Sequence, residues 1–424
     1  MPTCKHARLS LFVLGVLSVS TALHAQLLVD CSGSNPDEYP SINAALQNAG
    51  PGATILVTGV CSENVTLQGQ SGLNLGAPYG ETATLKGALS IQSSENIYLY
   101  GLHVTGSTID GITVSDSRAV FLDTTSSNGN TLNGLRVQGL SDVSILSSGE
   151  FNNNGSSGIW ANTNSVMWLN GWSGPVEVSH NALEGIDCEQ ATCGTLGNTR
   201  LRHNGAPSGF GVDLVAGASM EFASYYGPNV VEDNTSGGIS LQERSRLSIF
   251  GNNLSIIRNN GPLGVTIGFE SQLTSFFAQI TGHTSAGVDV YANSQVYLPG
   301  TNTIAENGSE SDASSAGVRA DGNSEVFLRG STIKRNTGPG LLVLVNSSAD
   351  FAGVSFGSNT GGTITCDSTG VMVSDLTHPE KRVVHCSTPH SLPARTLEKI
   401  EPRAPDLSWQ KALHEKYRKL ATRR

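Results

Sequence analysis

The chain has 424 residues, of which 49 are glycine, 14% are charged and 6% are aromatic. Hydrophobic residues make up only 38%, which argues against large helical cores, and the low charge argues against a disordered polyelectrolyte. A net charge of −10 at pH 7 argues against a nucleic-acid-binding protein, which needs a basic face.

Residues 1–25 are typical of a secretory signal peptide. Lys5, His6 and Arg8 form a basic start, and the apolar run from Leu9 to Leu23 is too short to span a bilayer comfortably. No later segment is apolar for long enough to form a transmembrane helix. We therefore expect a secreted or periplasmic protein without an integral membrane span.

A short helix is predicted at about residues 39–49, beginning near Ser41. Its apolar residues share one helical face: Ile42, Ala45, Leu46 and Ala49. We expect this helix to cover the N-terminal edge of the strands that follow, because an open edge invites aggregation.

A repeat then runs through most of the chain. A glycine followed by an aliphatic residue recurs at intervals of 23 to 30 residues, from Gly111-Ile112 to Gly340-Leu341. A polar residue that tolerates left-handed backbone precedes most of these glycines by four positions, and in two coils by more. Such amides, stacked coil on coil, form a hydrogen-bonded ladder: Asn130, Asn154, Asn181, Asn204, Asn234, Asn260, Asn307 and Asn336, with His283 as a substitute in one coil.

Within each repeat, apolar and polar residues alternate with a period of two, which indicates three short strands per turn. One coil cannot bury its own apolar face, but stacked coils share a continuous interior. The period is longer than the roughly 18 residues of left-handed hexapeptide coils. The sequence therefore predicts an all-β, single-stranded right-handed parallel β-helix of about 10–12 coils over residues 26–388.

Six cysteines follow the signal peptide, and an even number suggests disulfides in an exported protein. The absence of any CxxC pair makes a zinc site the weaker interpretation. Proximity in the sequence favours three pairs, the last of which closes a C-terminal cap at about 363–388: Cys31–Cys61, Cys188–Cys193 and Cys366–Cys386.

Residues 389–424 form a basic, proline-containing tail with nine Lys/Arg against four Asp/Glu, whereas the body from 26 to 388 has 14 against 31. Four residues at helical spacing predict a short helix there: Trp409, Leu413, Tyr417 and Leu420. A membrane- or partner-binding helix and a solvated helix docked on the acidic body both remain open.

The segments SINAAL (41–46), PGATI (51–55) and ENVTL (63–67) resemble the opening of pectate-lyase-like right-handed parallel β-helix proteins. The later Asn-x-x-x-Gly-aliphatic coils resemble their generic β-helix repeats, so the resemblance covers roughly residues 38–386. It implies the fold. It implies no single activity, because the superfamily includes lyases, glycoside hydrolases, epimerases, esterases, adhesins and phage tailspikes.

The second residue after each repeat glycine is expected to point outward, which predicts an exterior row about 4.8 Å apart from coil to coil. We call it the second-position row, and in chain order it is Thr113, Arg136, Trp160, Asp187, Asp213, Ser240, Thr266, Asp289, Arg319 and Leu342. Asn162 and Glu189 lie two residues further along two of these strands. The row's one ion pair is expected between Asp289 and Arg319, which would contribute little.

Asp187 and Asp213 are the candidate catalytic residues. Two carboxylates at this spacing raise the pKa of one of them, and most glycoside hydrolases cleave the glycosidic bond with a pair of carboxyl groups. Trp160 is a candidate for stacking on a sugar ring and Arg136 for binding a sugar carboxylate, with Asn162 and Glu189 beside them. The alternative is a polar, solvated sheet face without a function.

Two metal sites are also considered. Asp187, Glu189 and Asp213 offer the oxygen ligands that calcium prefers, although no cofactor is required by the sequence. His180 and His203 precede ladder asparagines of adjacent coils and form a candidate metal-binding pair, but surface turn histidines are common.

Motifs of characterised enzymes are missing. The polygalacturonase motifs are absent apart from a near match at Gly282-His283-Thr284, and no pectin methylesterase motif, Gly-x-Ser-x-Gly, phosphate-binding loop or zinc protease motif occurs. Two hypotheses follow: an exported protein that binds polysaccharide along an exterior groove, with cleavage by a lyase or hydrolase reaction left open, or a non-catalytic surface rod or adhesin. The oligomeric state is left open.

Overall fold

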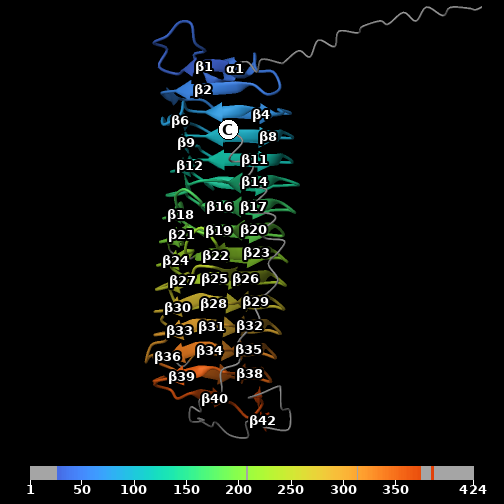
Figure 1. Cartoon of the computed structure of the whole chain (residues 1–424), viewed down its shortest axis with the longest axis vertical. Helices are drawn as coiled ribbons and strands as arrows, with labels where there is room; N and C mark the ends of the chain where they lie inside the picture. Colours follow the sequence, from blue (N-terminus) through green and yellow to red (C-terminus); the bar gives the residue numbers. More distant parts are fainter. Residues whose placement is uncertain (1–25, 207–208, 313, 374–382, 386–424) are drawn as a thin grey trace, which may run out of the picture.

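The computed structural model describes residues 26–206, 209–312, 314–373 and 383–385. Over these residues the chain winds into a right-handed parallel β-helix, a tall column in which successive coils stack along one axis (Figure 1). The solenoid has about 14 turns. The 10–12 coils expected from the sequence are too few, because the first coils lack the glycine that marks the later ones, and Ala88 takes its place before β7 (Leu89–Gln92).

Each coil passes through three sheets, here named A, B and C. Sheet A has 16 strands, in the order β1 (Gln26–Asp30), β2 (Thr54–Thr58), β5 (Asn74–Gly76), β8 (Glu95–Tyr100), β11 (Arg118–Asp123), β14 (Asp142–Ile145), β17 (Val166–Leu169), β20 (Thr192–Thr195), β23 (Ser219–Ser224), β26 (Arg246–Gly251), β29 (Gln272–Ser275), β32 (Gln295–Pro299), β35 (Glu325–Arg329), β38 (Ser348–Ala352), β41 (Val371–Val373) and β42 (Val383–His385). Sheet B has 13 strands, β3 (Val60–Cys61), β6 (Ala83–Lys86), β9 (Leu102–Thr105), β12 (Thr125–Asn128), β15 (Gly149–Glu150), β18 (Val176–Ser179), β21 (Thr199–Arg202), β24 (Val230–Glu232), β27 (Ser255–Arg258), β30 (Ala278–Thr281), β33 (Thr303–Ala305), β36 (Thr332–Lys334) and β39 (Ser355–Gly357).

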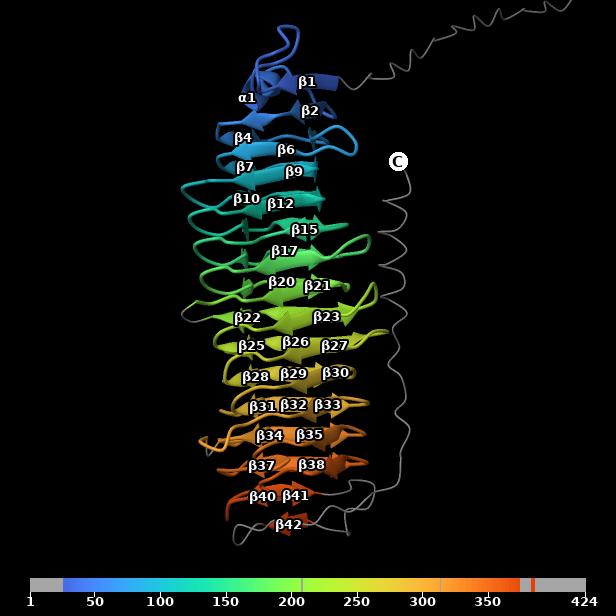
Figure 2. The ribbon, with the colours of Figure 1, turned by 90° about the vertical axis from the view of Figure 1, so that its left-hand side faces the viewer.

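Sheet C carries the second-position row. Its 13 strands are β4 (Val65–Gln68), β7, β10 (Ile112–Ser115), β13 (Leu135–Gln138), β16 (Ile159–Asn162), β19 (Ile186–Glu189), β22 (Phe210–Val215), β25 (Gly237–Leu241), β28 (Leu263–Ile267), β31 (Ala286–Val290), β34 (Ala316–Ala320), β37 (Leu341–Val343) and β40 (Ile364–Cys366). Turned by 90°, the column shows loops of varying length projecting from its sides between the stacked strands (Figure 2).

The two ends of the column are closed differently. At the N-terminal end, α1 (Ile42–Leu46) begins after Ser41, whose hydroxyl accepts a hydrogen bond from the Ala44 amide. The Glu63 carboxylate accepts two more, from the amides of Ile42 at 2.7 Å and Asn43 at 3.1 Å. The predicted capping helix is therefore present. At the other end, β42 pairs antiparallel with β41 and interrupts the parallel stacking.

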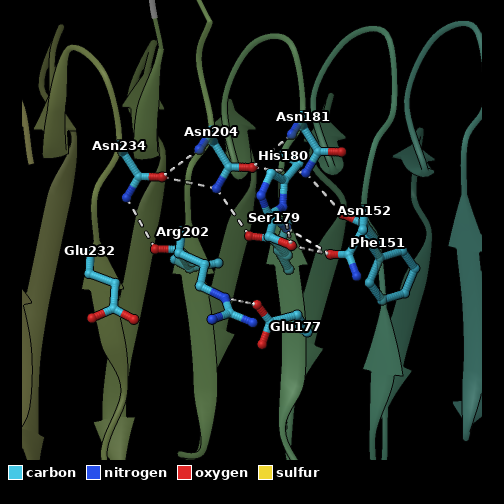
Figure 3. Close-up of polar contacts among 12 residues, drawn as sticks. Phe151, Asn152, Glu177, Ser179, His180, Asn181, Arg202, Asn204, Glu232 and Asn234 are labelled. Atoms are coloured by element: carbon cyan, nitrogen blue, oxygen red, sulfur yellow. Dashed lines mark hydrogen bonds and ion pairs between the residues drawn. The ribbon is translucent and has the colours of Figure 1, made fainter.

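The asparagines of the repeat turn stack into a ladder in which each amide bonds the next. The side-chain nitrogen of Asn181 donates to Asn204 Oδ1 at 2.9 Å, and Asn204 donates to Asn234 Oδ1 at 3.0 Å. Figure 3 shows these amides lined up across successive coils. The same pattern joins Asn130 to Asn154 and extends past Asn336 to Asn359, which the sequence analysis had not included.

His283 interrupts this ladder. Its ring nitrogens lie 3.1 Å from the carbonyl oxygen of Asn260 and 3.3 Å from that of Ile257, and the side chain is buried. An imidazole has no oxygen to accept from the preceding amide, so the Asn260 side-chain nitrogen donates only to the Val231 carbonyl, while Asn260 Oδ1 still accepts from Asn234. The substitution predicted from the sequence thus leaves a gap in the ladder between Asn260 and His283, whose backbone amide still donates to Asn307 Oδ1.

A second ladder, built from serines, runs along the turn between sheets C and A. The backbone amide of each serine donates to the hydroxyl of the next, from Ser94 to Ser117 to Ser141 near the N-terminal end. The pattern returns in the later coils at Ser245, Ser271, Ser294, Ser324 and Ser347. Ala191 and Ala218 occupy the serine position between Ser165 and Ser245, in the coils that carry Asp187 and Asp213.

Two of the three predicted disulfides are present, Cys31–Cys61 and Cys188–Cys193. Cys366 is disulfide-bonded as well, but Cys386 lies outside the described residues. The predicted signal peptide (1–25) and the basic tail (389–424) lie outside them too. No helix among the described residues is long and apolar enough to cross a membrane.

Candidate functional site

The second-position row exists in the register that the glycine spacing predicts. Arg136 of β13 pairs with Trp160 of β16, Trp160 with Asp187 of β19, and Asp187 with Asp213 of β22. These residues alternate with fully buried apolar neighbours, so their side chains point away from the core. The row therefore brings two carboxyl groups, an indole and a guanidinium together on the outside of sheet C.

The carboxyl groups of Asp187 and Asp213 are both held toward the protonated form. Burial, with the charges of Glu184, Asp213 and Glu189, raises the pKa of Asp187 to about 7. Burial and Glu184 raise the pKa of Asp213 to about 6, although hydrogen bonds from Ser240 and the Leu214 amide oppose the shift. Between pH 6 and pH 7 the pair therefore holds about one proton instead of carrying two full charges.

No cation of the row neutralises this pair. Arg136 lies two coils away, where its guanidinium contacts Asp110 at 3.5 Å and its Cζ lies 4.5 Å from the centroid of the Trp160 ring. Arg319 pairs with Asp289 and Asp321 at the far end of the row. Arg136 is thus placed beside the candidate stacking ring and away from the acidic pair.

Several polar atoms of this region are buried and have no hydrogen-bond partner. Such orphaned atoms are few in folded proteins because each costs about 1–3 kcal/mol. Among the described residues, four of them belong to the candidate site: Arg136 Nε, Trp160 Nε1, Asn162 Oδ1 and Asp213 Oδ1. They lie on β13, β16 and β22, three of four consecutive strands of sheet C, as a surface completed by a polar ligand would show.

Glu184 was missed by the sequence analysis. It lies in the turn directly before Gly185, outside the alternating strand pattern, and its carboxylate accepts a hydrogen bond from the Ser157 hydroxyl at 3.2 Å. Its charge raises the pKa of both Asp187 and Asp213. The available signal was its position three residues before Asp187, where a turn side chain can reach the outward face.

Calcium at the predicted oxygen triad of Asp187, Glu189 and Asp213 remains a prediction. Among the described residues, the one group of three or more His, Cys, Asp or Glu side chains with all ligand atoms within 4.8 Å is Cys31, Cys61 and Glu63, whose cysteines form a disulfide. Asp187, Glu189 and Asp213 do not converge in this way. The other predicted metal pair does come together, since the rings of His180 and His203 have centroids 5.0 Å apart.

A second aromatic surface was also missed. Its base is a buried apolar cluster of Leu196, Ala223 and Phe250, separate from the solenoid core and near the ends of sheet A strands, and the partly buried Trp168 packs against it. The Trp168 ring lies across Gly194 of the next strand, where a Cβ atom would come within 2.3 Å of the ring. This second aromatic surface is a competing location for any ligand that stacks on aromatic rings.

No protein-family model and no curated protein matches the chain. Among solved structures, the A-module of the mannuronan C-5 epimerase AlgE6 from Azotobacter vinelandii is 16% identical, with a TM-score of 0.40 over 79% of this chain and 93% of that one. A mannuronic acid specific polysaccharide family 6 lyase from human gut microbiota is 12% identical, with a TM-score of 0.33 over 94% and 100%.

The catalytic unit of the GH87 α-1,3-glucanase from Streptomyces thermodiastaticus strain HF3-3 is 12% identical, with a TM-score of 0.35 over 84% of this chain and 68% of that one. At these identities and TM-scores the neighbours assign the chain no activity. The chain has the right-handed parallel β-helix fold that its sequence predicts.

Proposed function

We propose that the protein is an exported glycan-cleaving enzyme whose site is the part of the second-position row from Arg136 to Asp213. The observation that carries the proposal is the pairing of Asp187 with Asp213 on adjacent strands, with both carboxyl pKa values raised toward neutrality. A carboxyl group that is protonated near pH 7 can act as a general acid, and its ionised neighbour can act as nucleophile or base.

The spacing favours a retaining hydrolysis. Adjacent parallel strands lie about 4.8 Å apart, close to the roughly 5–5.5 Å that separates the carboxyl groups of retaining glycosidases. Asp187, which has the higher pKa, would protonate the glycosidic oxygen as the bond to the anomeric carbon breaks. Asp213 would attack that carbon, and water activated by the ionised Asp187 would then release the sugar and restore both groups.

The substrate is expected to be a neutral glycan. The body is strongly acidic, and Glu184 and Glu189 add charge around the pair, so a polyuronate would be repelled. A lyase also needs a basic residue to abstract a proton, and the row offers only Arg136 nearby, already engaged by Asp110 and Trp160. Trp160 lies between Arg136 and Asp187 in the row, where a sugar ring next to the cleaved bond would stack.

Export fits the same proposal. The buried Cys188–Cys193 bridge joins β19 of sheet C to β20 of sheet A, next to Asp187 in the chain, and disulfides persist in oxidising compartments. The predicted signal peptide would deliver the chain there.

The test is a panel of neutral and uronic polysaccharides incubated with the mature protein, measuring new reducing ends together with the absorbance of unsaturated uronides. We expect reducing ends without that absorbance on at least one neutral glycan, and loss of about 10³-fold or more in Asp187→Asn and Asp213→Asn. Asp289→Asn is the matched control, since Asp289 occupies the same row beside Arg319.

Three outcomes would contradict the proposal. Absorbance at the uronide wavelength would indicate a lyase, and cleavage that survives both substitutions would place the site elsewhere. Binding without cleavage, unaffected by Trp160→Ala but abolished by Trp168→Ala, would assign the ligand to the second aromatic surface and favour a non-catalytic β-helix.

A further inference from the structure

The turn that carries the asparagine ladder also holds two histidines in equivalent places. His180 follows β18 and His203 follows β21, and these strands pair in parallel register up to Ser179 and Arg202. Both histidines have left-handed backbone, with φ of 56° and 54°. The ladder bonds from Asn181 to Asn204 Oδ1, at 3.2 Å from the backbone and 2.9 Å from the side chain, fix the residues that follow them.

The rings of these histidines are spaced as two ligands of one ion would be. With a metal–nitrogen bond of about 2.0–2.1 Å and about 1.2 Å from nitrogen to ring centre, two imidazoles on one ion place their centroids roughly 4.5 Å apart at 90° and 5.2 Å apart at 109°. The measured separation is 5.0 Å, with the ring planes 39° apart.

A hydrogen bond sets the tautomer of His180. The hydroxyl of Ser179 donates to Asn152 Oδ1 at 2.9 Å, so it can only accept from the His180 Nδ1, which lies 3.2 Å away. The proton on Nδ1 leaves the lone pair of Nε2 for a ligand bond, which is the usual second-shell arrangement of metal-binding histidines. His180 lies beside the ladder amides in Figure 3.

The surroundings admit an ion from solvent. Both histidines are exposed and line a surface hollow of about 550 Å³ together with Asn153, Asn154 and Asn181. Glu177 is paired with Arg202 and Glu232 with Arg258, so these neighbouring charges are balanced. Asp233 directly precedes a ladder asparagine, as His180 and His203 do. It therefore places a carboxylate one coil beyond His203.

We propose that His180 and His203 form a surface site for one borderline divalent cation of the Zn²⁺, Cu²⁺ or Ni²⁺ class, clamping two adjacent coils together. Imidazole nitrogen selects these ions over Ca²⁺ and Mg²⁺, which prefer oxygen. The site lies on the turn between sheets B and C and is independent of the carboxyl pair on sheet C.

The experiment uses metal-stripped, untagged mature protein, calorimetric titration with Zn²⁺, and Cu²⁺ paramagnetic resonance to count nitrogen ligands. We expect one site per chain with two nitrogen ligands, and at least a tenfold loss of affinity in His180→Asn and in His203→Asn. Asparagine is the suitable replacement, because Asn153 holds the same slot with the same left-handed backbone in the preceding coil. His103→Asn is the control for an imidazole elsewhere on the solenoid.

Circular dichroism verifies that each variant keeps the β-helix. The absence of Zn²⁺ binding by the wild type, an affinity unchanged in both variants, or an equal loss in His103→Asn would overturn the site. Calcium is expected to give no binding that depends on either histidine.

Discussion

Asp187 and Asp213 face each other across the β19–β22 pair, two carboxyl groups in register on the outside of a sheet, each with its pKa raised toward neutrality. Asp289 and Arg319 occupy the same row in later coils and neutralise each other in part. The contrast shows that one repeat position can carry an ordinary ion pair in one place and an unbalanced acidic pair in another.

The first prediction concerns stability and pH. An acid with a raised native pKa binds more protons when folded, so the unfolding free energy falls as pH rises from about 4 to about 7. Asp187→Asn should therefore increase the unfolding free energy above pH 7, by roughly 2–4 kcal/mol at about 1.4 kcal/mol per pKa unit. Urea unfolding at several pH values measures this.

The matching control is Asp30→Asn. Hydrogen bonds from Ser32 and Ser34 lower the pKa of Asp30, so its contribution has the opposite sign and is lost as pH falls. If Asp187→Asn and Asp30→Asn shift stability in the same direction at pH 8, the raised pKa of Asp187 is refuted.

The second prediction concerns Trp160. Replacing it with alanine removes the stacking surface next to Asp187. Binding of the glycan substrate should weaken by about 10-fold or more, because stacking of a sugar on the indole ring and burial of that ring contribute roughly 1–3 kcal/mol. Trp160→Phe should retain most of the affinity. Equilibrium binding to the glycan, measured in the Asp187→Asn background to prevent turnover, decides this, and an equal loss in both Trp160 variants would argue against stacking.

The third prediction concerns the gap in the asparagine ladder. His283→Asn should restore an acceptor for the Asn260 amides and raise the unfolding free energy by about 1–2 kcal/mol, the net effect of one or two buried hydrogen bonds. Burial lowers the pKa of His283, so the wild type should also lose stability as pH falls below about 6.5, and the variant should not. Chemical unfolding at pH 5 and pH 8 tests both effects; a destabilised variant would contradict the ladder's role.

The fourth prediction concerns the disulfide next to the candidate site. Cys188 and Cys193 are fully buried and five residues apart in sequence, so replacing both with alanine should cost about 2 kcal/mol of unfolding free energy from loop closure alone. Because Cys188 directly follows Asp187, the variant should also show a lower turnover rate at unchanged fold. Circular dichroism and the reducing-end assay report these separately, and full activity in the variant would show that the bridge does not position the strand.

The sequence alone could predict the fold and the row of exterior residues, because both depend on a fixed period. Each glycine sets the phase of its strand, so the register that joins Arg136, Trp160, Asp187 and Asp213 follows from counting. The number of coils was underestimated at the N-terminal end because Ala88 occupies the position of the repeat glycine there.

What the sequence could not predict depends on side-chain direction and depth. Glu184 reaches the acidic pair from a turn, where no period applies, and the carboxylate oxygens of Asp187, Glu189 and Asp213 do not all lie within 4.8 Å of one another. The serine ladder could not be predicted, because a buried hydroxyl and an exposed one look the same in a sequence.

The most direct test of the central claim is the pH profile of the initial cleavage rate, for the wild type and Asp187→Asn. The account predicts a narrow bell with limbs near pH 6 and pH 7, because only the singly protonated pair is active, and no such bell in the variant. A profile that is flat from pH 5 to pH 8, or a bell that persists in Asp187→Asn, would contradict it.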